Sequence, residues 1–372
     1  MKAGDGMPLD DGQEEVDLLI GRAEIDVEEY YTQAKEELTA KMEEYWRKLN
    51  AKDKVKRAQL EAGEITAEEY QMWRIGQVII GSRWDEMRAN IAADLTNYQE
   101  IAKSIVTRYM PDAYAAGFNF GTYSVEKIAK LDTSFTLYDR PTVERIIREK
   151  PQLLPDLNPR SKVAQEIAEE KINKWHEKQI QSVCTQGVSQ GESIPQIAER
   201  ITDITKQDEK ATIRYARTMM TGAENAGRTD SYERAENMGI KLEQQWLATL
   251  DERTRETHRK MDGEHKPVGK PFSNGCRFPG DPQGPADQIW NCRCTLIPML
   301  TGIPELEADN DVTNTELRNT DHMAEGGYSS YDEWKQGHMK PHKITEQKEK
   351  GENIKNAWVG KYKAAAKRLE VK

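Results

Sequence analysis

Apolar positions recur at steps of three and four through much of the first 110 residues, which is the period of one helical face. One stripe, between Asp26 and Asn50, consists of Val27, Tyr31, Ala34, Leu38, Met42, Tyr45 and Leu49. A second stripe, which ends before Pro111, consists of Met87, Ile91, Leu95, Tyr98, Ile101 and Ile105. Gly63 interrupts the pattern, and Thr66 with Glu69 has the spacing of a capping box. The pattern predicts two long antiparallel helices.

The segment from Ala113 to Arg160 has no such stripe. Gly117, Gly121 and four prolines divide it into short pieces, which predicts a connector with one short helix at Val143 to Glu149. Helical periodicity returns at Ser161 and stops at Gly187. Further helices are expected from Ser193 and over about 209–237. The last of these carries a strip of small residues where another backbone could pack, formed by Ala216, Ala223, Ala226 and Gly227.

The period changes to two between Ile240 and Leu250, which predicts a strand. Ten of the 23 residues from Gly263 to Pro285 are Gly or Pro, so short strands and turns are expected there. The motif WNCRC, at 290–294, is expected to close this loop-rich module, with Trp290 sealing a small core and Asn291 satisfying loop backbone. It should also bring Cys292 and Cys294 close to His258.

The expected fold class is therefore α+β. A long helical N-terminal half is followed by a mainly helical middle, a small mixed α/β loop-rich module and a helical tail. The expected boundaries are a helical hairpin region at 1–112, a connector at 113–160, one domain at 161–300, and a polar, basic helical tail at 301–372. The domain at 161–300 consists of helices at 161–238 and a module containing Cys and His at 240–300.

Composition limits the class of protein. Charged residues make up 32% of the 372 residues, mean hydropathy is -0.86, and no apolar run has the length of a signal peptide core or a membrane span. The chain is expected to start in a cytoplasm, where clustered cysteines indicate a metal site or plain thiols rather than disulfides. From Lys335 to Lys372 there are 11 Lys and Arg against 4 Asp and Glu, so a tail of charge +7 follows a body of charge -17. Such a tail can touch nucleic acid or form a solvated helix face.

Five potential soft-metal ligands fall within 37 residues: His258, His265, Cys276, Cys292 and Cys294. A closed tetrahedral set of His258, Cys276, Cys292 and Cys294 would hold structural zinc, the one cofactor considered. The alternative is that the thiols pack inside the module and the histidines form hydrogen bonds. The spacing leaves both interpretations open.

An enzyme would need a catalytic set. His258 and Asp262 on one helical face, after Arg253 and Arg255, could serve as a base and its orienting group in a metal-dependent hydrolase or transferase. No nucleophile turn, phosphate loop or paired carboxylates accompany them, and the two arginines fit clamps on loop carbonyls or carboxylates. No catalytic residues are expected.

Three runs in order, ARTMMTGAENAGRTDSYERAENMGI, QWLATLDERTRETHRKMDGE and FPGDPQGPADQIWNCRC, resemble the phage head morphogenesis family, the minor head proteins of the phage Mu F type. The residues that carry this resemblance are Trp246, Asp251, Arg253, Arg255, His258, Asp262, Gly263, Asn291, Cys292, Arg293 and Cys294. Upstream, FTLYDRPTVERII is similar more loosely, and SSYDEWKQG after the module is a common tail feature of the family.

The resemblance implies a minor head protein of a tailed double-stranded DNA phage, which acts in head morphogenesis and in DNA packaging or ejection. Its implied partners are the portal protein, the major capsid or scaffolding protein, and double-stranded DNA bound without sequence preference; no membrane is implied. It would be found in the host cytoplasm during assembly and then inside the capsid of the virion.

Overall fold

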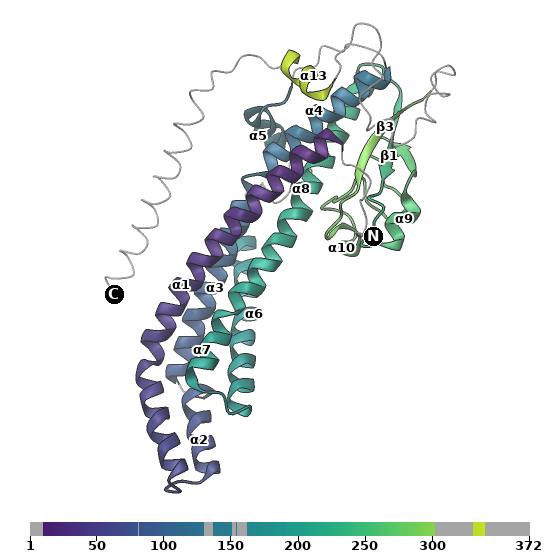
Figure 1. The fold of residues 1–372 in the computed structure, drawn as a ribbon. Coiled ribbons are helices and arrows are strands. Elements are labelled where there is room, and N and C mark those ends of the chain that lie inside the picture. The colour runs from purple at the N-terminus through teal and green to yellow at the C-terminus, as the bar shows by residue number, and fades with distance from the viewer. Residues whose placement is uncertain are drawn as a thin grey trace, which may run out of the picture.

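The computed structural model describes residues 10–80, 82–129, 137–150, 154, 162–301 and 330–338. Long helices lie side by side in a stalk, and a small sheet packs near one end of it (Figure 1). The predicted α+β class is confirmed. The helices are α1 (Asp11–Glu61), α2 (Ala67–Val78), α3 (Ser82–Thr107), α4 (Met110–Ala129), α5 (Arg140–Glu149), α6 (Lys162–Ser189), α7 (Ile194–Thr202), α8 (Ile204–Asn237), α9 (Glu256–Met261), α10 (Ala286–Ile289) and α13 (Tyr331–His338). Within the described residues, no helix is both long and apolar enough to cross a bilayer.

The first helix is longer than its apolar stripe predicts. Asp10 and Gln13 form a capping box at its start, where the Asp10 carboxylate accepts from the Gln13 backbone N–H at 2.8 Å. Its last turns contain few apolar side chains and are attached to α2 by a polar contact instead. The Tyr70 hydroxyl donates to the buried Asp53 carboxylate at 2.7 Å.

Two hydrophobic cores follow each other along the molecule. The stalk core joins α1, α3, α6, α7 and the start of α8, and includes Val27, Tyr31, Leu38, Trp46, Leu95, Ala102, Ile180, Cys184, Ile197 and Ala216. The junction core joins the start of α1, α4, α5, the second half of α8 and the sheet, and includes Val16, Tyr114, Val125, Val143, Met220, Ala226, Tyr232, Trp246, Cys294 and Leu296. Both cores run across the predicted domain boundaries, which stay predictions.

The expected connector is wrong over its first part, because α4 is a buried 20-residue helix. Gly117 and Gly121 are helical residues whose missing side chains let α4 lie against α8. A Cβ on Gly117 would overlap the backbone carbonyl of Glu224, and one on Gly121 would overlap the Ser231 hydroxyl. The complementary strip predicted on α8 is confirmed, since a Cβ on Gly227 would overlap the Tyr114 carbonyl.

Three antiparallel strands form the sheet, in the order β2 (His265–Pro267), β1 (Leu242–Leu247) and β3 (Thr295–Leu300). Strand β1 is central, with Gln244 opposite Lys266 on one side and Trp246 opposite Leu296 on the other. The sheet lies beside α4 and α8 (Figure 1). This arrangement places the loops after β1 and before β3 next to α8.

A short helix near the other end of the sequence, α13, closes over α4. Tyr331 and Trp334 pack against Phe120 and Tyr123, and the Trp334 indole N–H donates to Glu126 at 2.6 Å. The remainder of the predicted helical tail lies outside the described residues.

Candidate functional site in the cysteine and histidine module

The site begins where β1 brings Trp246 into the module. Trp246 is fully buried and meets two rings edge to face, His258 at 5.5 Å and Phe272 at 5.2 Å between centroids. His258 stands on α9, in the loop that follows β1. The indole therefore fixes the imidazole ring against the core.

Asp251 and Arg293 form a clamp between the loop after β1 and the segment before β3. The guanidinium donates two hydrogen bonds to the carboxylate, at 2.5 and 2.7 Å. These bonds, together with one from Thr254, hold the pKa of Asp251 well below its ordinary value. Arg253, by contrast, is largely exposed, and its nearest guanidinium nitrogen is 3.7 Å from the Asp251 carboxylate. The predicted arginine clamp on a carboxylate thus belongs to Arg293.

The other signature residues of the loop satisfy backbone groups. Arg255 donates to the Trp290 carbonyl, as expected for a clamp on a loop carbonyl. Asp262 accepts from the Ala248 N–H at 2.9 Å, and Gly263, at a φ of 83°, donates its N–H to the Trp246 carbonyl at 2.9 Å. Asp262 therefore does not orient His258. The base and orienting pair of the alternative enzyme interpretation is therefore not formed by these two residues.

WNCRC closes the module in a different way from the one expected. Trp290, the C-cap residue of α10, is 43% exposed and seals no core, whereas Ile289, the last residue of that helix, is buried. Asn291 has a left-handed φ of 55°, and its N–H donates to the Thr218 hydroxyl of α8 at 3.0 Å. This contact fastens the motif to the stalk.

His258 lies close to Cys292 and Cys294, as the sequence predicted. Its Nδ1 is 3.7 Å from the Cys292 sulfur and 3.4 Å from the Cys294 sulfur, and all three residues are buried. The pKa of Cys294 is lowered well below its ordinary value, because Cys292 donates a hydrogen bond to its sulfur and His258 adds a second. The same bond raises the pKa of Cys292.

The other two potential ligands do not join this group. The Cys276 sulfur packs against Gly284 beside Ile289, and burial raises its pKa to about 12. His265 is exposed and contacts Glu243 at 2.5 Å on the neighbouring strand. Among the described residues, the atoms within 4.8 Å of one another that could hold a metal belong to His258, Cys292 and Cys294 alone. The predicted four-ligand set is corrected to three.

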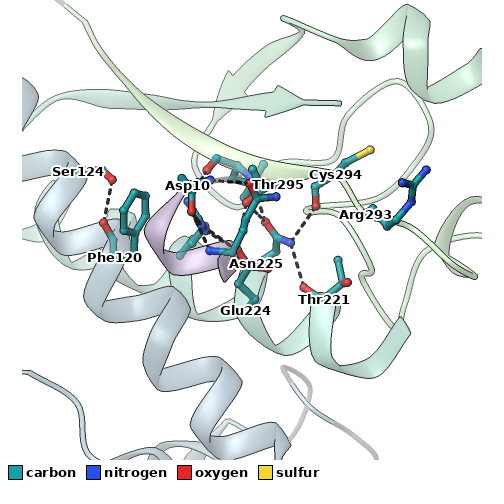
Figure 2. A network of polar contacts seen from close by, with 12 residues as sticks. Asp10, Phe120, Ser124, Thr221, Glu224, Asn225, Arg293, Cys294 and Thr295 are labelled. Atoms are coloured by element: carbon teal, nitrogen blue, oxygen red, sulfur yellow. Dashed lines mark hydrogen bonds and ion pairs between the residues drawn. The ribbon is translucent and has the colours of Figure 1, made fainter. Parts of the chain in front are cut away.

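A buried polar network on α8 was not predicted. Asn225 accepts from the Leu296 N–H at 3.0 Å and donates to the Cys294 carbonyl at 3.3 Å, so its amide binds the start of β3 (Figure 2). Arg228 donates to Glu224 at 2.8 Å, to Asp10 at 2.7 Å and to the Leu296 carbonyl at 3.2 Å. The available signal was three polar residues inside the small-residue strip of one helix.

The charges of this network are fully enclosed. Burial raises the pKa of Glu224 to about 7, although the Arg228 guanidinium opposes the shift. Burial also disfavours the charge of Arg228, but the carboxylates of Asp10 and Glu224 together raise its pKa. The network joins the N-cap residue of α1, the second half of α8 and the edge strand β3.

Comparisons with known proteins match this same part of the chain. The family model described as "Phage Mu protein F like protein" matches residues 178–297, from α6 to β3. A minor head protein, GP7 of Bacillus phage SPP1, is 27% identical over 223 residues, which cover 59% of this chain and 67% of GP7. Residues 178–297 therefore match the phage Mu F-like family, and the similarity to GP7 extends over more than half of the chain. No solved structure matches it.

Two other relatives are similar to less than half of this chain. The NAD(+)--arginine ADP-ribosyltransferase EFV of Enterococcus faecalis is 34% identical over 184 residues, 46% of this chain and 34% of its own length. An uncharacterised protein of Haemophilus influenzae is 30% identical over 137 residues, 37% of this chain and 28% of its own length. The chain therefore spans about a third of each of these two relatives.

Proposed function

We propose that this Mu F-like protein is a minor head protein of a tailed double-stranded DNA phage, and that it acts in head morphogenesis by binding other head components. The observation that carries the proposal is the match of residues 178–297 to the Mu F-like model, extended by the similarity to the SPP1 minor head protein over two thirds of that protein. The protein would be found in the host cytoplasm during assembly and then in the virion.

The stalk is the proposed binding surface for the portal, major capsid or scaffolding protein. Large apolar side chains are exposed on α6: Val163 is 63%, Ile167 49% and Trp175 41% exposed. Positions 163, 167 and 175 are four and eight residues apart, so they lie along one face of the helix. A hollow that includes Trp175, Gln99 and Arg214 continues this face between α3 and α8. Exposed apolar side chains grouped on one face favour protein contact.

A copurification experiment tests this surface. The full chain is coexpressed with the portal protein of the same phage, and the α6 double variant Val163→Asp with Ile167→Asp is compared with Val55→Asp. Val55 is also exposed, at 60%, but lies near the far end of α1. We expect the portal to be retained by the wild type and by Val55→Asp and lost with the α6 variant. Equal retention by all three would contradict the proposed surface.

The basic segment from Lys335 to Lys372 is the proposed contact with packaged DNA. Its +7 balance favours attachment to phosphates that weakens with salt and does not read bases. Removal of residues 339–372 leaves α13 in place and should weaken DNA retention at low salt without affecting portal binding. If the shortened chain binds DNA equally well across a salt series, the segment is a solvated surface.

The named activity of the Enterococcus faecalis relative supports a second candidate, transfer of ADP-ribose from NAD to arginine. We favour binding over catalysis, because His258 faces two thiols and Asp262 is used by the backbone. The full chain is incubated with labelled NAD and an arginine-rich acceptor. Transfer that disappears in Asp251→Ala, His258→Ala or Asp262→Ala, while the variants still assemble, would replace the structural proposal with an enzyme.

A further inference from the structure

Three soft donor atoms meet in the interior of the module. The Nδ1 of His258 lies 3.4 Å from the Cys294 sulfur and 3.7 Å from the Cys292 sulfur, and the three donor atoms all lie within 4.8 Å of one another. Around a tetrahedral zinc ion, with usual bond lengths, a nitrogen and a sulfur ligand are separated by about 3.6 Å. The two nitrogen–sulfur distances lie on either side of this value.

The ligands are held in place by contacts that do not involve one another. His258 is fixed by the Trp246 ring, and the Cys292 N–H donates to the Ile289 carbonyl at 3.2 Å. Cys294 presents its carbonyl to Asn225 and directs its sulfur away from that residue (Figure 2). Arg293, between the two cysteines, is clamped by Asp251. The surrounding residues therefore position the two cysteines by hydrogen bonds and the imidazole by ring packing.

We propose that His258, Cys292 and Cys294 bind one soft divalent cation, which we take to be Zn²⁺, with a water molecule as the fourth ligand. Two thiolates balance the charge of the ion, and the neutral imidazole adds none, so the complex carries no net charge and can be buried. No fourth His, Cys, Asp or Glu of the described residues joins the group. This inference is independent of the proposed function.

The cation would lock the module closed. It joins α9 to the segment before β3, two pieces of chain that are more than 30 residues apart in sequence. Because the unfolded chain does not hold these ligands together, the free energy of binding would stabilise the folded module. A cross-link of this kind suits a module with little regular structure between β2 and α10.

The test uses the full chain, purified without chelator, and measures bound metal by mass spectrometry. We expect about one zinc per chain, and after replacement by Co²⁺ an absorption band from thiolate-to-cobalt charge transfer. Cys292→Ser and Cys294→Ser should each lose most of the metal and weaken that band. Cys276→Ser and Cys184→Ser are matched controls, because both remove a buried thiol outside the group, and both should keep the metal.

Two results would overturn the proposal. One is wild-type protein that takes up neither zinc nor cobalt and shows no change in Tm after chelation. The two thiols and the imidazole would then form a hydrogen-bonded group without metal. The other is loss of metal in Cys276→Ser as large as in Cys292→Ser, which would contradict the three-residue site. If Cys292→Ser does not fold, the cobalt titration of the wild type still decides, because it requires no variant.

Discussion

Arg228 is a buried cation held by two carboxylates. It donates to Glu224 on its own helix and to Asp10 at the start of α1, and all three residues are at most 5% exposed. Buried charges of this kind cost desolvation, which their mutual attraction offsets only when the hydrogen bonds are complete. The third bond of Arg228, to the Leu296 carbonyl, uses a donor that would otherwise be unpaired.

Glu224 gives this network a dependence on pH. Its pKa is raised from 4.5 to about 7 by burial, so the folded state retains a proton that the unfolded state has lost between these values. The contribution of Glu224 to stability is thus full below about pH 4.5 and is lost as the pH rises through about 7. Glu224→Gln cannot ionise. Relative to wild type, we expect its free energy of unfolding to increase from pH 5 to pH 8 by on the order of 1–3 kcal/mol.

Urea unfolding of the two proteins across this pH range measures the difference directly, and all other titrating groups cancel in it. Parallel curves would mean that Glu224 is already ionised in the folded protein at pH 5.

The Asp251 clamp gives the opposite dependence. Arg293 lowers the pKa of Asp251 below 3.8, so the stabilisation is present above that value and is lost as the pH falls. Arg293→Lys keeps the charge and loses one of the two hydrogen bonds to the carboxylate. We expect the free energy of unfolding to fall by about 1–2 kcal/mol at pH 7, and this difference from wild type should become smaller below about pH 4. Arg253→Lys is the control, because the Arg253 side chain is 76% exposed. A loss equal in both variants would show that the paired geometry contributes nothing.

At the scale of single residues, the sequence predicted which part of the chain forms the site, but it did not predict every contact between the side chains. Spacing alone brought His258 to Cys292 and Cys294, since the Gly- and Pro-rich segment between them had to fold back. It could not separate Cys276 from them, because the direction of a cysteine side chain in an irregular loop depends on neighbours such as Gly284. Helical spacing also allowed Asp262 to lie beside His258, whereas the Asp262 carboxylate accepts from the backbone N–H of Ala248.

The pairing of α4 with α8 decides the architecture at the scale of elements. Gly117 and Gly121 of α4 and Gly227 of α8 lie at the contact, and each faces backbone or a short side chain of the other helix. In the sequence, Gly117 and Gly121 predict breaks in a helix. A glycine in a turn and a glycine in a close helix contact cannot be told apart unless the partner helix is known. The apolar stripes of α1 and α3 have no such ambiguity, because a long stripe with helical period predicts a helix without knowledge of its partner.

Gly227→Ala tests the α4 contact. The added Cβ would overlap the Tyr114 carbonyl, so the two helices must separate. We expect the free energy of unfolding to fall by about 1–3 kcal/mol. Gly21→Ala in α1 and Gly76→Ala in α2 are matched controls, since a Cβ there meets nothing within 4 Å. The controls should be stabilised by up to about 1 kcal/mol, because alanine is the better helix former. Thermal unfolding followed by circular dichroism gives the three values. If Gly227→Ala is as stable as wild type, α4 and α8 are not in close contact at this position.

At the scale of the whole molecule, α8 runs through both cores. Its first turns belong to the stalk core and its second half to the junction core, where Arg228 ties it to α1 and β3. The two cores are nonetheless separate groups of side chains. Local opening of the junction therefore need not open the stalk.

Asp10→Ala tests this separation. The change removes the N-cap of α1 and one of the two carboxylates that hold Arg228, so we expect amide exchange to accelerate roughly 5- to 30-fold in residues 11–20 and 295–300. The stalk core, measured over residues 31–42 and 87–102, should not change. Thr66→Ala removes the capping box of α2 at the far end of the stalk, and only α2 should respond. Hydrogen exchange with mass spectrometry resolves these segments. Equal acceleration in the stalk after Asp10→Ala would show that both cores open as one unit, and no acceleration beside β3 would show that Arg228 keeps its place through Glu224 and Leu296 alone.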